Sequence, residues 1–462
     1  MRYRAAPLPE QGANLMKKLI TKQVFNLQSN GQKRLSLTNS LRMSILVRQA
    51  FIKDINSPHH NKVKDIFIDN GIILQIDDHL NQKADTIVEA NGMHLSPGWV
   101  DIFVTGTDPG YEFKDTLENI SLSASAGGFT HLFVTPNTNP VVQNKATVDY
   151  ILGKSVSQPV DFHPIGAITK NTEGKELSEM YDMKNGGAIA FGDGIRSVQS
   201  SGILIKALQY VSAFNGIIIQ LPDDHSIAPH GLMNEGIVST QIGLPGKPAL
   251  AEEIMVSRDL ALAKYTGSRI HLTGISLATT LEMIRNAKKE GIQVTCSCTP
   301  HHLLFTDEDL LKGYDTNLKV NPPLRSTADR SALIEGVKDG TIDCITSHHT
   351  PQHTDAKVCE FEYAGFGIIG LESVFGLLQS TGLTEEEILN CISLNPRKIF
   401  GLDSTIESGK KADFTVYKTD ENYHFLHHHI KSKSSNSPYL GKELKGKVFA
   451  TVLGDKTNLN VK

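Results

Sequence analysis

The chain has 462 residues, of which 39% are hydrophobic and 21% are charged, and its formal net charge is −4. This size accommodates one large and one small domain with a sizeable core, and the composition is that of an ordinary globular protein. Residues 1–42 carry +7 from eight Lys/Arg and one Glu, which leaves −11 for the rest and argues against nucleic acid as the main partner. No stretch approaches the about 20 apolar residues of a membrane-spanning helix, so we expect no membrane partner.

The five cysteines occupy positions 296, 298, 344, 359 and 391. An odd number in so long a chain does not suggest a disulfide framework, so we expect a reducing, cytoplasmic location. Cys296 and Cys298 lie two residues apart on one face of a predicted strand, as a soft-metal pair or as small buried apolar residues. We favour the second interpretation, which is the usual role of free cysteine.

Residues 1–42 show no clear hydrophobic periodicity. They are basic and nearly free of acid, as organellar presequences are. We favour instead a disordered extension, or translated sequence upstream of a start at Met43, and expect it not to pack on the rest. From Met43 to residue 98 the pattern predicts strands, among them a hairpin with an Asn70-Gly71 turn and a strand at 86–90.

Residues 99–400 alternate short apolar runs with helical patterns. Strands are predicted at 99–104, 131–134, 162–166, 217–220, 269–272, 293–296 and 343–346, and helices at 251–266 and 277–290. Repeated strand–helix units over about 300 residues predict an α/β fold, a parallel (β/α)8 TIM barrel. Strand patterns return after residue 400, in 406–417 and in a last hairpin predicted at 446–455.

Motifs in a fixed order run through this part of the chain. They are Ser96-Pro97-Gly98 with Asp101 and Pro109-Gly110, Thr135-Pro136-Asn137-Thr138-Asn139-Pro140, Gly166-Ala167-Ile168-Thr169-Lys170, Thr299-Pro300-His301-His302-Leu303, Lys319-Val320-Asn321-Pro322-Pro323-Leu324-Arg325 and Gly367-Ile368-Ile369-Gly370-Leu371-Glu372. In these motifs the chain resembles the dihydroorotases of the cyclic amidohydrolase superfamily, from Met43 to its C-terminus. The resemblance implies a barrel of the metal-dependent hydrolase type at 99–400, and a small composite β-sandwich from residues 43–98 and 401–462.

In the family, side chains at the strand ends bind two zinc ions and the substrate. The resemblance places substitutions at the metal positions Phe103, Thr105, Leu221 and Gly274, at the catalytic Asp position, which is His348, and at the substrate positions Thr107 (for Arg) and Gln352 (for His). It leaves in place the bridging metal ligand Asp193 and the substrate-pocket positions Asn137, Asn321 and Gly367.

These substitutions bear directly on the chemistry. Zinc lowers the pKa of a bridging water and so supplies the nucleophile for hydrolysis of a cyclic amide, and the Asp then moves the proton to the leaving nitrogen. Phenyl and leucine side chains have no lone pair for zinc, and a threonine hydroxyl is a poor ligand. We therefore expect no metal and no other cofactor, and a catalytically silent pseudoenzyme.

An alternative is a rebuilt metal site. His348, His349 and His353 would form it, with Asp193 or His225, and zinc would then be the cofactor. His301 and His302 belong to a fold motif of the family and need no catalytic role. His427, His428 and His429 lie in a polar segment that we interpret as a solvated loop.

Three functions follow from the resemblance. The first is a silent dihydroorotase-like protein of pyrimidine biosynthesis, which assembles with aspartate carbamoyltransferase or with itself. The second is an active dihydroorotase that hydrolyses the dihydroorotate ring to carbamoyl aspartate at a rebuilt metal site. The third is a small-molecule binding module that uses the old pocket.

Overall fold

The computed structural model describes residues 44–402 and 404–460. The predicted extension at residues 1–42 lies outside the described residues, so the expectation that it does not pack on the rest stays a prediction. The described residues belong to one compact unit. None of the helices in the described ranges is long and apolar enough to cross a membrane.

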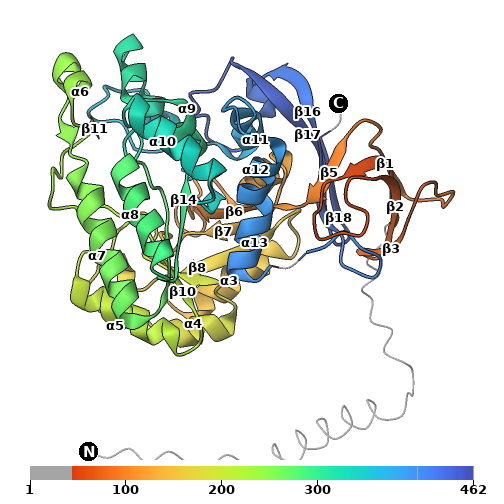
Figure 1. Ribbon diagram of the computed structural model, residues 1–462, viewed down its shortest axis with the longest axis horizontal. Helices are drawn as coiled ribbons and strands as arrows, with labels where there is room; N and C mark the ends of the chain where they lie inside the picture. The colour runs from red at the N-terminus through yellow and green to blue at the C-terminus, as the bar shows by residue number, and fades with distance from the viewer. Residues whose placement is uncertain (1–43, 403, 461–462) are drawn as a thin grey trace, which may run out of the picture. The chain divides into compact units, whose positions relative to one another are not determined.

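Eight parallel strands form the central sheet, which curls into a nearly closed barrel (Figure 1). In sheet order they are β6 (Trp99–Val104), β7 (Phe129–Val134), β8 (Asp161–Gly166), β9 (Ala190–Phe191), β10 (Ile217–Gln220), β13 (Arg269–Leu272), β14 (Val294–Cys298) and β15 (Cys344–Ile345). Bonds after the last strand close the ring: Thr105 N donates to His349 O over 3.0 Å, and Asp101 accepts from Ser347 N over 2.8 Å. The predicted TIM barrel is confirmed.

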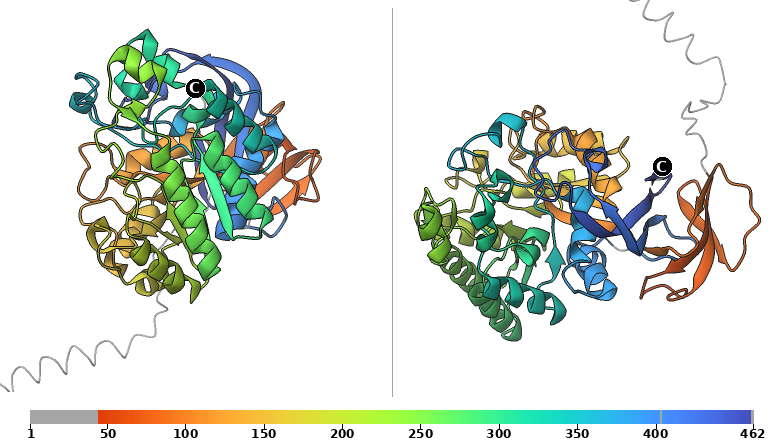
Figure 2. Two further views of the ribbon diagram at one scale, coloured as in Figure 1. Left: turned by 60° about the vertical axis from the view of Figure 1, so that its left-hand side comes forward. Right: turned by 90° about the horizontal axis from the view of Figure 1, so that it is seen from above.

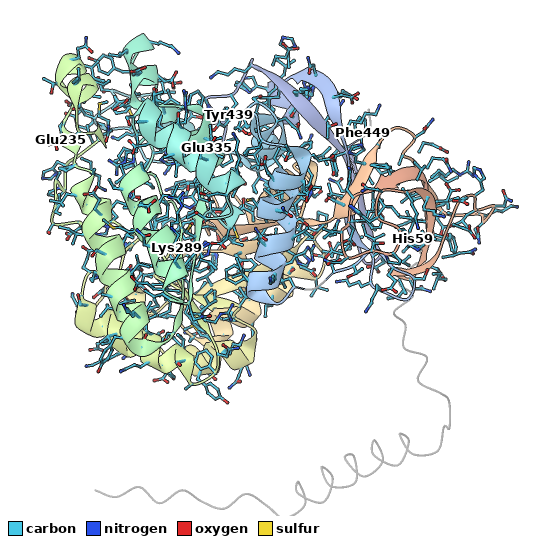
Figure 3. All side chains as sticks on the ribbon, viewed as in Figure 1. His59, Glu235, Lys289, Glu335, Tyr439 and Phe449 are labelled. Atoms are coloured by element: carbon cyan, nitrogen blue, oxygen red, sulfur yellow. The ribbon has the colours of Figure 1, made fainter. Side chains whose placement is uncertain are left out.

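Helices cover the outside of the barrel (Figures 1 and 2). They are α2 (Leu117–Ala126), α3 (Lys145–Ser155), α4 (Met180–Gly186), α5 (Ser201–Ser212), α7 (Leu250–Thr266), α8 (Ala278–Lys289), α9 (Pro300–Leu304), α10 (Thr327–Lys338), α11 (Val374–Leu378), α12 (Glu385–Leu389) and α13 (Asn395–Phe400). On α8 the buried side chains are Thr280, Leu281, Ile284 and Ala287, the stripe of an amphipathic helix. Lys289 and Glu335 lie on the exposed side of this layer (Figure 3).

One irregular segment, here called the 225–247 excursion, leaves the barrel after β10. It holds β11 (Met233–Asn234), α6 (Ile237–Ile242) and β12 (Gly246–Lys247), and β11 pairs with β12 in parallel. Arg325 anchors it, because its Nη1 donates to Asn234 Oδ1 over 3.0 Å while its Nε donates to Ser276 Oγ over 3.0 Å. The excursion thereby brings Lys247 back to the barrel.

A second, mixed sheet combines both ends of the described chain. Its strands run in the order β18 (Lys456–Leu459), β17 (Glu443–Leu453), β16 (Asp413–His424), β5 (His94–Pro97), β1 (Ser44–Ile52), β2 (Val63–Asp69) and β3 (Ile72–Asp77), and β4 (Thr86–Glu89) pairs with β1. Figure 2 shows this sheet beside the barrel, where β5 pairs with β16.

Two hairpins of this sheet compare differently with their predictions. The Asn70-Gly71 turn joins β2 to β3 as predicted, with φ of 50° and 75°, the left-handed pair that a type I′ turn requires. The last hairpin, predicted at 446–455, is present but longer, because β17 and β18 together run from Glu443 to Leu459. β17 runs straight through Gly446, and the turn lies at Gly454-Asp455, before β18.

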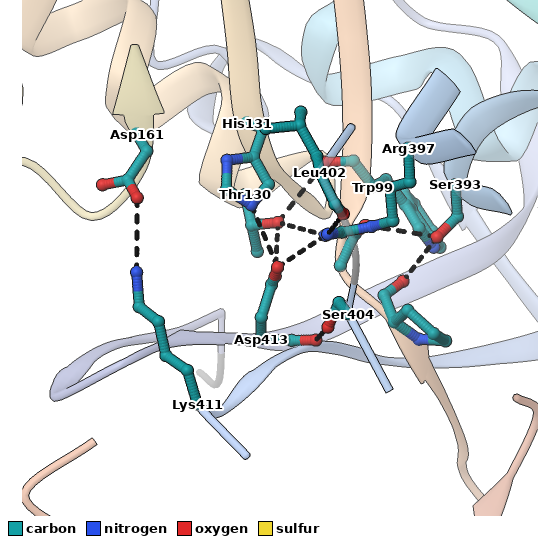
Figure 4. A network of polar contacts seen from close by, with 12 residues as sticks. Trp99, Thr130, His131, Asp161, Ser393, Arg397, Leu402, Ser404, Lys411 and Asp413 are labelled. Atoms are coloured by element: carbon teal, nitrogen blue, oxygen red, sulfur yellow. Dashed lines mark hydrogen bonds and ion pairs between the residues drawn. The ribbon is translucent and has the colours of Figure 1, made fainter. Parts of the chain in front are cut away.

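A buried polar network joins this sheet to the base of the barrel (Figure 4). Asp413 on β16 pairs with Arg397 of α13 at 2.7 Å and with His131 of β7 at 2.9 Å, and it accepts a hydrogen bond from Thr130 Oγ1 over 2.8 Å. Arg397 also donates to Gly98 O. Burial opposes the charge of Asp413, but the neighbouring Arg397 and His131 hold its pKa below the ordinary value.

Candidate active site at the barrel mouth

A cavity of about 470 Å³ lies at the carboxyl ends of the barrel strands, where barrels of this type place their sites. Phe103, Leu221, His301 and His348 each lie at or just after the end of a strand and line it. Other parts of the wall include Asn321, Val320, Phe366, Gly367 and Ile368, and Asp223, His225 and Lys247 around the excursion. Six site positions named from the sequence therefore meet here: Phe103, Leu221, Asn321, His348, Gln352 and Gly367.

His348 is held in an unusual conformation. Its φ is +47°, a left-handed value that non-glycine residues rarely adopt, and such values gather at functional sites. Its Nε2 is hydrogen bonded to Thr273 Oγ1 over 2.8 Å, and its ring lies against that of Phe103 with centroids 4.6 Å apart. Burial lowers the pKa of His348 to about 3, and nearby His302 and His271 act in the same direction. The ring is therefore neutral at pH 7.

The side chains at the implied metal positions do not fit zinc. The rings of Phe103 and His348 are in contact, and Leu221 lines the same cavity. Gly274 has φ +72°, and a Cβ there would lie 2.9 Å from His348 Cε1 and 2.9 Å from Leu221 Cδ1, so no larger ligand side chain fits. Thr105 Oγ1 is hydrogen bonded to Thr350 Oγ1 over 2.8 Å. The implied metal space is thus packed with carbon atoms and neutral hydroxyls.

From the resemblance we expected Asp193, the one retained metal position, to face one cavity together with His348, but Asp193 does not line the cavity. Its carboxylate accepts hydrogen bonds from Thr169 N over 2.9 Å and from Thr169 Oγ1 over 2.5 Å. Burial raises its pKa to about 6. Asn137 is also outside the lining: its Nδ2 donates to Asp193 O over 3.0 Å and its Oδ1 accepts from Ile195 N over 2.9 Å. The hydrogen bonds of both side chains therefore hold loops in place at the barrel mouth.

The proposed histidine cluster does not assemble. His348 bonds to Thr273, while His349 accepts a hydrogen bond from Gly370 N at Nδ1, and His353 lies against Phe113 and Asp355. Within residues 44–402 and 404–460, no three His, Cys, Asp or Glu side chains are placed to hold a metal ion. His427, His428 and His429 form an exposed or half-exposed 3-10 turn away from the cavity.

The substituted substrate positions have different surroundings. Thr107 is buried, and its Oγ1 has no hydrogen-bond partner among the described residues. Gln352 lines the cavity, and its Nε2 donates to Phe366 O over 2.8 Å. Neither side chain can pair with a carboxylate as a guanidinium does.

Sequence reasoning missed the polar wall of the cavity. Lys247 Nζ lies 2.6 Å from Asp223 Oδ2 and donates to Asn321 Oδ1 over 2.9 Å, and Asn321 Nδ2 donates to Asp223 Oδ2 over 3.0 Å. Asp223 lies three residues after the end of β10, so its place at the barrel mouth could have been predicted from that position. Lys247 carries no such signal, because it belongs to the irregular excursion.

The fold and the mouth cavity define a barrel of the cyclic amidohydrolase type. Solved structures share this fold: the chain superposes on the L-hydantoinase (dihydropyrimidinase) from Arthrobacter aurescens with a TM-score of 0.77 and 23% identity, over 91% of this chain and 98% of that one. A D-hydantoinase gives a TM-score of 0.76 and 18% identity, over 90% of this chain and 95% of that one.

Sequence comparison shows which family within this class of barrels the chain belongs to. A family model described as dihydro-orotase-like matches residues 92–279. The dihydroorotase of Ruminiclostridium cellulolyticum is 39% identical over 419 residues, which cover 89% of this chain and 97% of the relative. That of Acetivibrio thermocellus is 41% identical over 400 residues, covering 85% and 94%. The chain belongs to the dihydroorotase family.

Proposed function

We propose that this dihydroorotase-family chain serves pyrimidine biosynthesis without metal-dependent ring hydrolysis. One observation carries the proposal: the Phe103 and His348 rings are in contact, and Leu221 lines the same cavity, where the family implies two zinc ions. Without a Lewis acid, neither a hydroxide nucleophile nor a polarised ring carbonyl is available near neutral pH. A neutral, buried His348 in place of the catalytic Asp offers no carboxylate to move the proton.

The second candidate is an active dihydroorotase, which converts dihydroorotate to carbamoyl aspartate. A specific observation favours it: relatives that match this chain over almost their whole length, at 39–41% identity, are named dihydroorotase. The comparisons thus support the active candidate more than the silent one, whereas the packing at the barrel mouth supports the silent one. Activity would require a set of side chains other than those that the family uses.

Purified protein distinguishes the two candidates. The protein is incubated with excess zinc and desalted, its metal content is measured, and both directions of the dihydroorotate reaction are assayed. The R. cellulolyticum relative, treated identically, is the positive control. The silent candidate predicts substoichiometric zinc and no turnover above the blank. Stoichiometric zinc with turnover within tenfold of the control establishes the active candidate instead.

A silent family member needs another reason to persist, and we propose assembly. The partner that the resemblance suggests is aspartate carbamoyltransferase, with self-association as the other form. Sizing of the two purified proteins, alone and mixed at several concentrations, tests it. A common peak with a fixed ratio supports assembly with the transferase, and independent elution at every concentration removes that partner.

A further inference from the structure

The charged groups that line the mouth cavity neutralise one another. Lys247 and Asp223 form an ion pair of 2.6 Å, and both are largely buried, with side-chain exposures of 14% and 8%. The Asn321 amide closes the group by bonding to both partners. His225, which lines the cavity beside this pair, is 45% exposed and lies 3.7 Å from Asp223. Among the described lining residues, no cation is left over for a ligand carboxylate.

The polar groups that remain in the lining are Thr350 and Gln352, which are hydrogen bonded to other protein groups, the exposed His225, and two buried imidazoles. His301 and His348 line the cavity with exposures of 4% and 8%. Among the described residues the His302 ring bonds to Thr299 and to main-chain carbonyls, whereas the His301 ring forms no hydrogen bond. His348 forms one through Nε2 and none through Nδ1. Burial lowers the pKa of both rings, so they act as neutral donors and acceptors.

A chain of hydrogen bonds behind the cavity fixes the orientation of His348. Its Nε2 bonds to Thr273 Oγ1 over 2.8 Å, Thr273 accepts from Ser297 Oγ over 2.9 Å, and Ser297 bonds to His271 Nε2 over 3.0 Å. The chain ends at Thr295 Oγ1, 2.8 Å from His271 Nδ1. All of these groups are uncharged, so they polarise His348 without giving it a charge. Because Nε2 is engaged, Nδ1 is the ring nitrogen of His348 that has no hydrogen-bond partner among the described residues.

The rest of the lining is mostly apolar, with Phe103, Leu221, Val320 and Ile368 around the imidazoles. Burying an ionised group beside these side chains costs free energy unless a counter-charge meets it, whereas an uncharged ring with donor and acceptor groups is matched by the two imidazoles. The volume of about 470 Å³ suits a small ring compound.

We propose that this cavity binds an uncharged cyclic amide or imide, held by His348 and His301, and discriminates against the same ring bearing a carboxylate. The inference rests on the proposed function in taking the mouth cavity as a ligand site without zinc. The inference adds the class of ligand, an uncharged ring, whereas the family resemblance alone implies a ligand with a carboxylate.

Calorimetry with a matched pair of probes tests the proposal at pH 7.5. Dihydrouracil and dihydroorotate share one ring and differ by the carboxylate. We expect saturable binding of dihydrouracil that is at least tenfold tighter than that of dihydroorotate. Equal or tighter binding of dihydroorotate overturns the proposal, and so does the absence of binding of both probes at millimolar concentration.

Two variants locate the cause. Asp223→Asn keeps the shape of the side chain but removes the negative charge that neutralises Lys247. It should therefore increase the affinity for dihydroorotate at least fivefold and change the affinity for dihydrouracil less than twofold. His348→Phe should weaken dihydrouracil at least tenfold, with Lys289→Met, on the exposed face of α8, as the matched control. If His348→Phe does not fold, the Asp223→Asn variant still tests whether the charge of the cavity sets the ligand preference. An unchanged dihydroorotate affinity in a folded Asp223→Asn protein contradicts the charge argument.

The test of ligand preference can fail independently of the test of the proposed function. Zinc content and turnover decide whether the chain is silent, and neither enters the calorimetry. A silent protein that prefers dihydroorotate overturns the ligand class alone. A protein that turns dihydroorotate over with bound zinc overturns the proposed function, and the preference for dihydrouracil is then measured as competitive inhibition.

Discussion

The phenyl ring of Phe103 lies against the imidazole of His348, with centroids 4.6 Å apart and an interplanar angle of 34°. The two residues are 245 positions apart in the chain, at the ends of the strands β6 and β15 that close the barrel. Their contact places an aromatic pair where the family implies a metal-binding histidine and a catalytic carboxylate. The mouth of this barrel is therefore a packed aromatic surface beside a cavity.

Restoring two histidines should not restore a metal centre. The double variant Phe103→His, Thr105→His leaves Leu221, Gly274 and His348 in place, so zinc still lacks most of its ligands. We expect zinc below one tenth of an equivalent after desalting and no turnover of dihydroorotate. Because the new imidazole is buried beside apolar side chains, the free energy of unfolding should fall by about 1–3 kcal/mol. Stoichiometric zinc in this variant would show that these two positions decide the site.

Gly274 should be intolerant of substitution because of packing. Both Gly274 and Gly267 have positive φ, +72° and +65°, but only at Gly274 would a Cβ meet other atoms within 3 Å. Gly267→Ala measures the backbone cost alone, about 1–2 kcal/mol. Gly274→Ala should cost about 1–3 kcal/mol more, from overpacking against His348 and Leu221. Equal losses in urea unfolding would mean that the mouth repacks freely around the added methyl group.

Arg397 should be essential for joining the second sheet to the barrel. Arg397→Met leaves Asp413 buried and charged, so we expect a loss of about 3–5 kcal/mol in the free energy of unfolding. Lys411→Met removes a more exposed ion pair with Asp161, at 3.4 Å, and should cost less than about 1 kcal/mol. Chemical unfolding of both variants gives the comparison. Similar losses would place the stability of this junction outside the Asp413 network.

Buried neutral histidines should make the protein sensitive to acid. Burial, with Lys288 nearby, lowers the pKa of His271 to about 3, whereas an unfolded histidine titrates near its ordinary value of 6.5. The unfolded state therefore binds more protons between these values, and stability falls as the pH drops from about 6.5 toward 3.

A His271→Asn variant isolates this contribution. It should lose up to about 1.4 kcal/mol per pH unit of that dependence between pH 6 and 4.5, measured as unfolding free energy against pH. The slope of His427→Asn, an exposed residue, should match that of the unchanged protein. An unchanged slope in His271→Asn would mean that His271 is protonated in the folded state or that its burial is relieved by local opening.

Much of the barrel was predictable, because buried parallel strands are nearly continuous apolar runs. The strands at Ile217–Gln220 and Arg269–Leu272 were predicted to the residue. β9, with only Ala190–Phe191, was not among the predicted strands, because two residues carry no periodicity. β16 begins later than the predicted run and extends beyond its end at residue 417, because its second half alternates exposed residues that form a strand only by pairing with β17.

The site was less predictable than the fold. A strand-end position shows which residues reach the mouth, as it did for Phe103 and His348, but not which way each side chain turns. Asp193 lies near the mouth, but its carboxylate accepts hydrogen bonds from Thr169. This contact between two loops cannot be predicted from the spacing of residues in the sequence. Lys247 enters from the excursion and was not anticipated, although it decides the charge of the cavity.

Whether the barrel mouth can hold zinc is measured by the metal content and turnover of the zinc-treated, desalted protein, since the Phe103–His348 contact and Leu221 occupy the implied metal space. We expect less than one tenth of an equivalent of zinc and no conversion of dihydroorotate or carbamoyl aspartate above the blank, while the R. cellulolyticum dihydroorotase is active in the same assay. One or more equivalents of zinc together with turnover that a chelator abolishes would contradict this expectation.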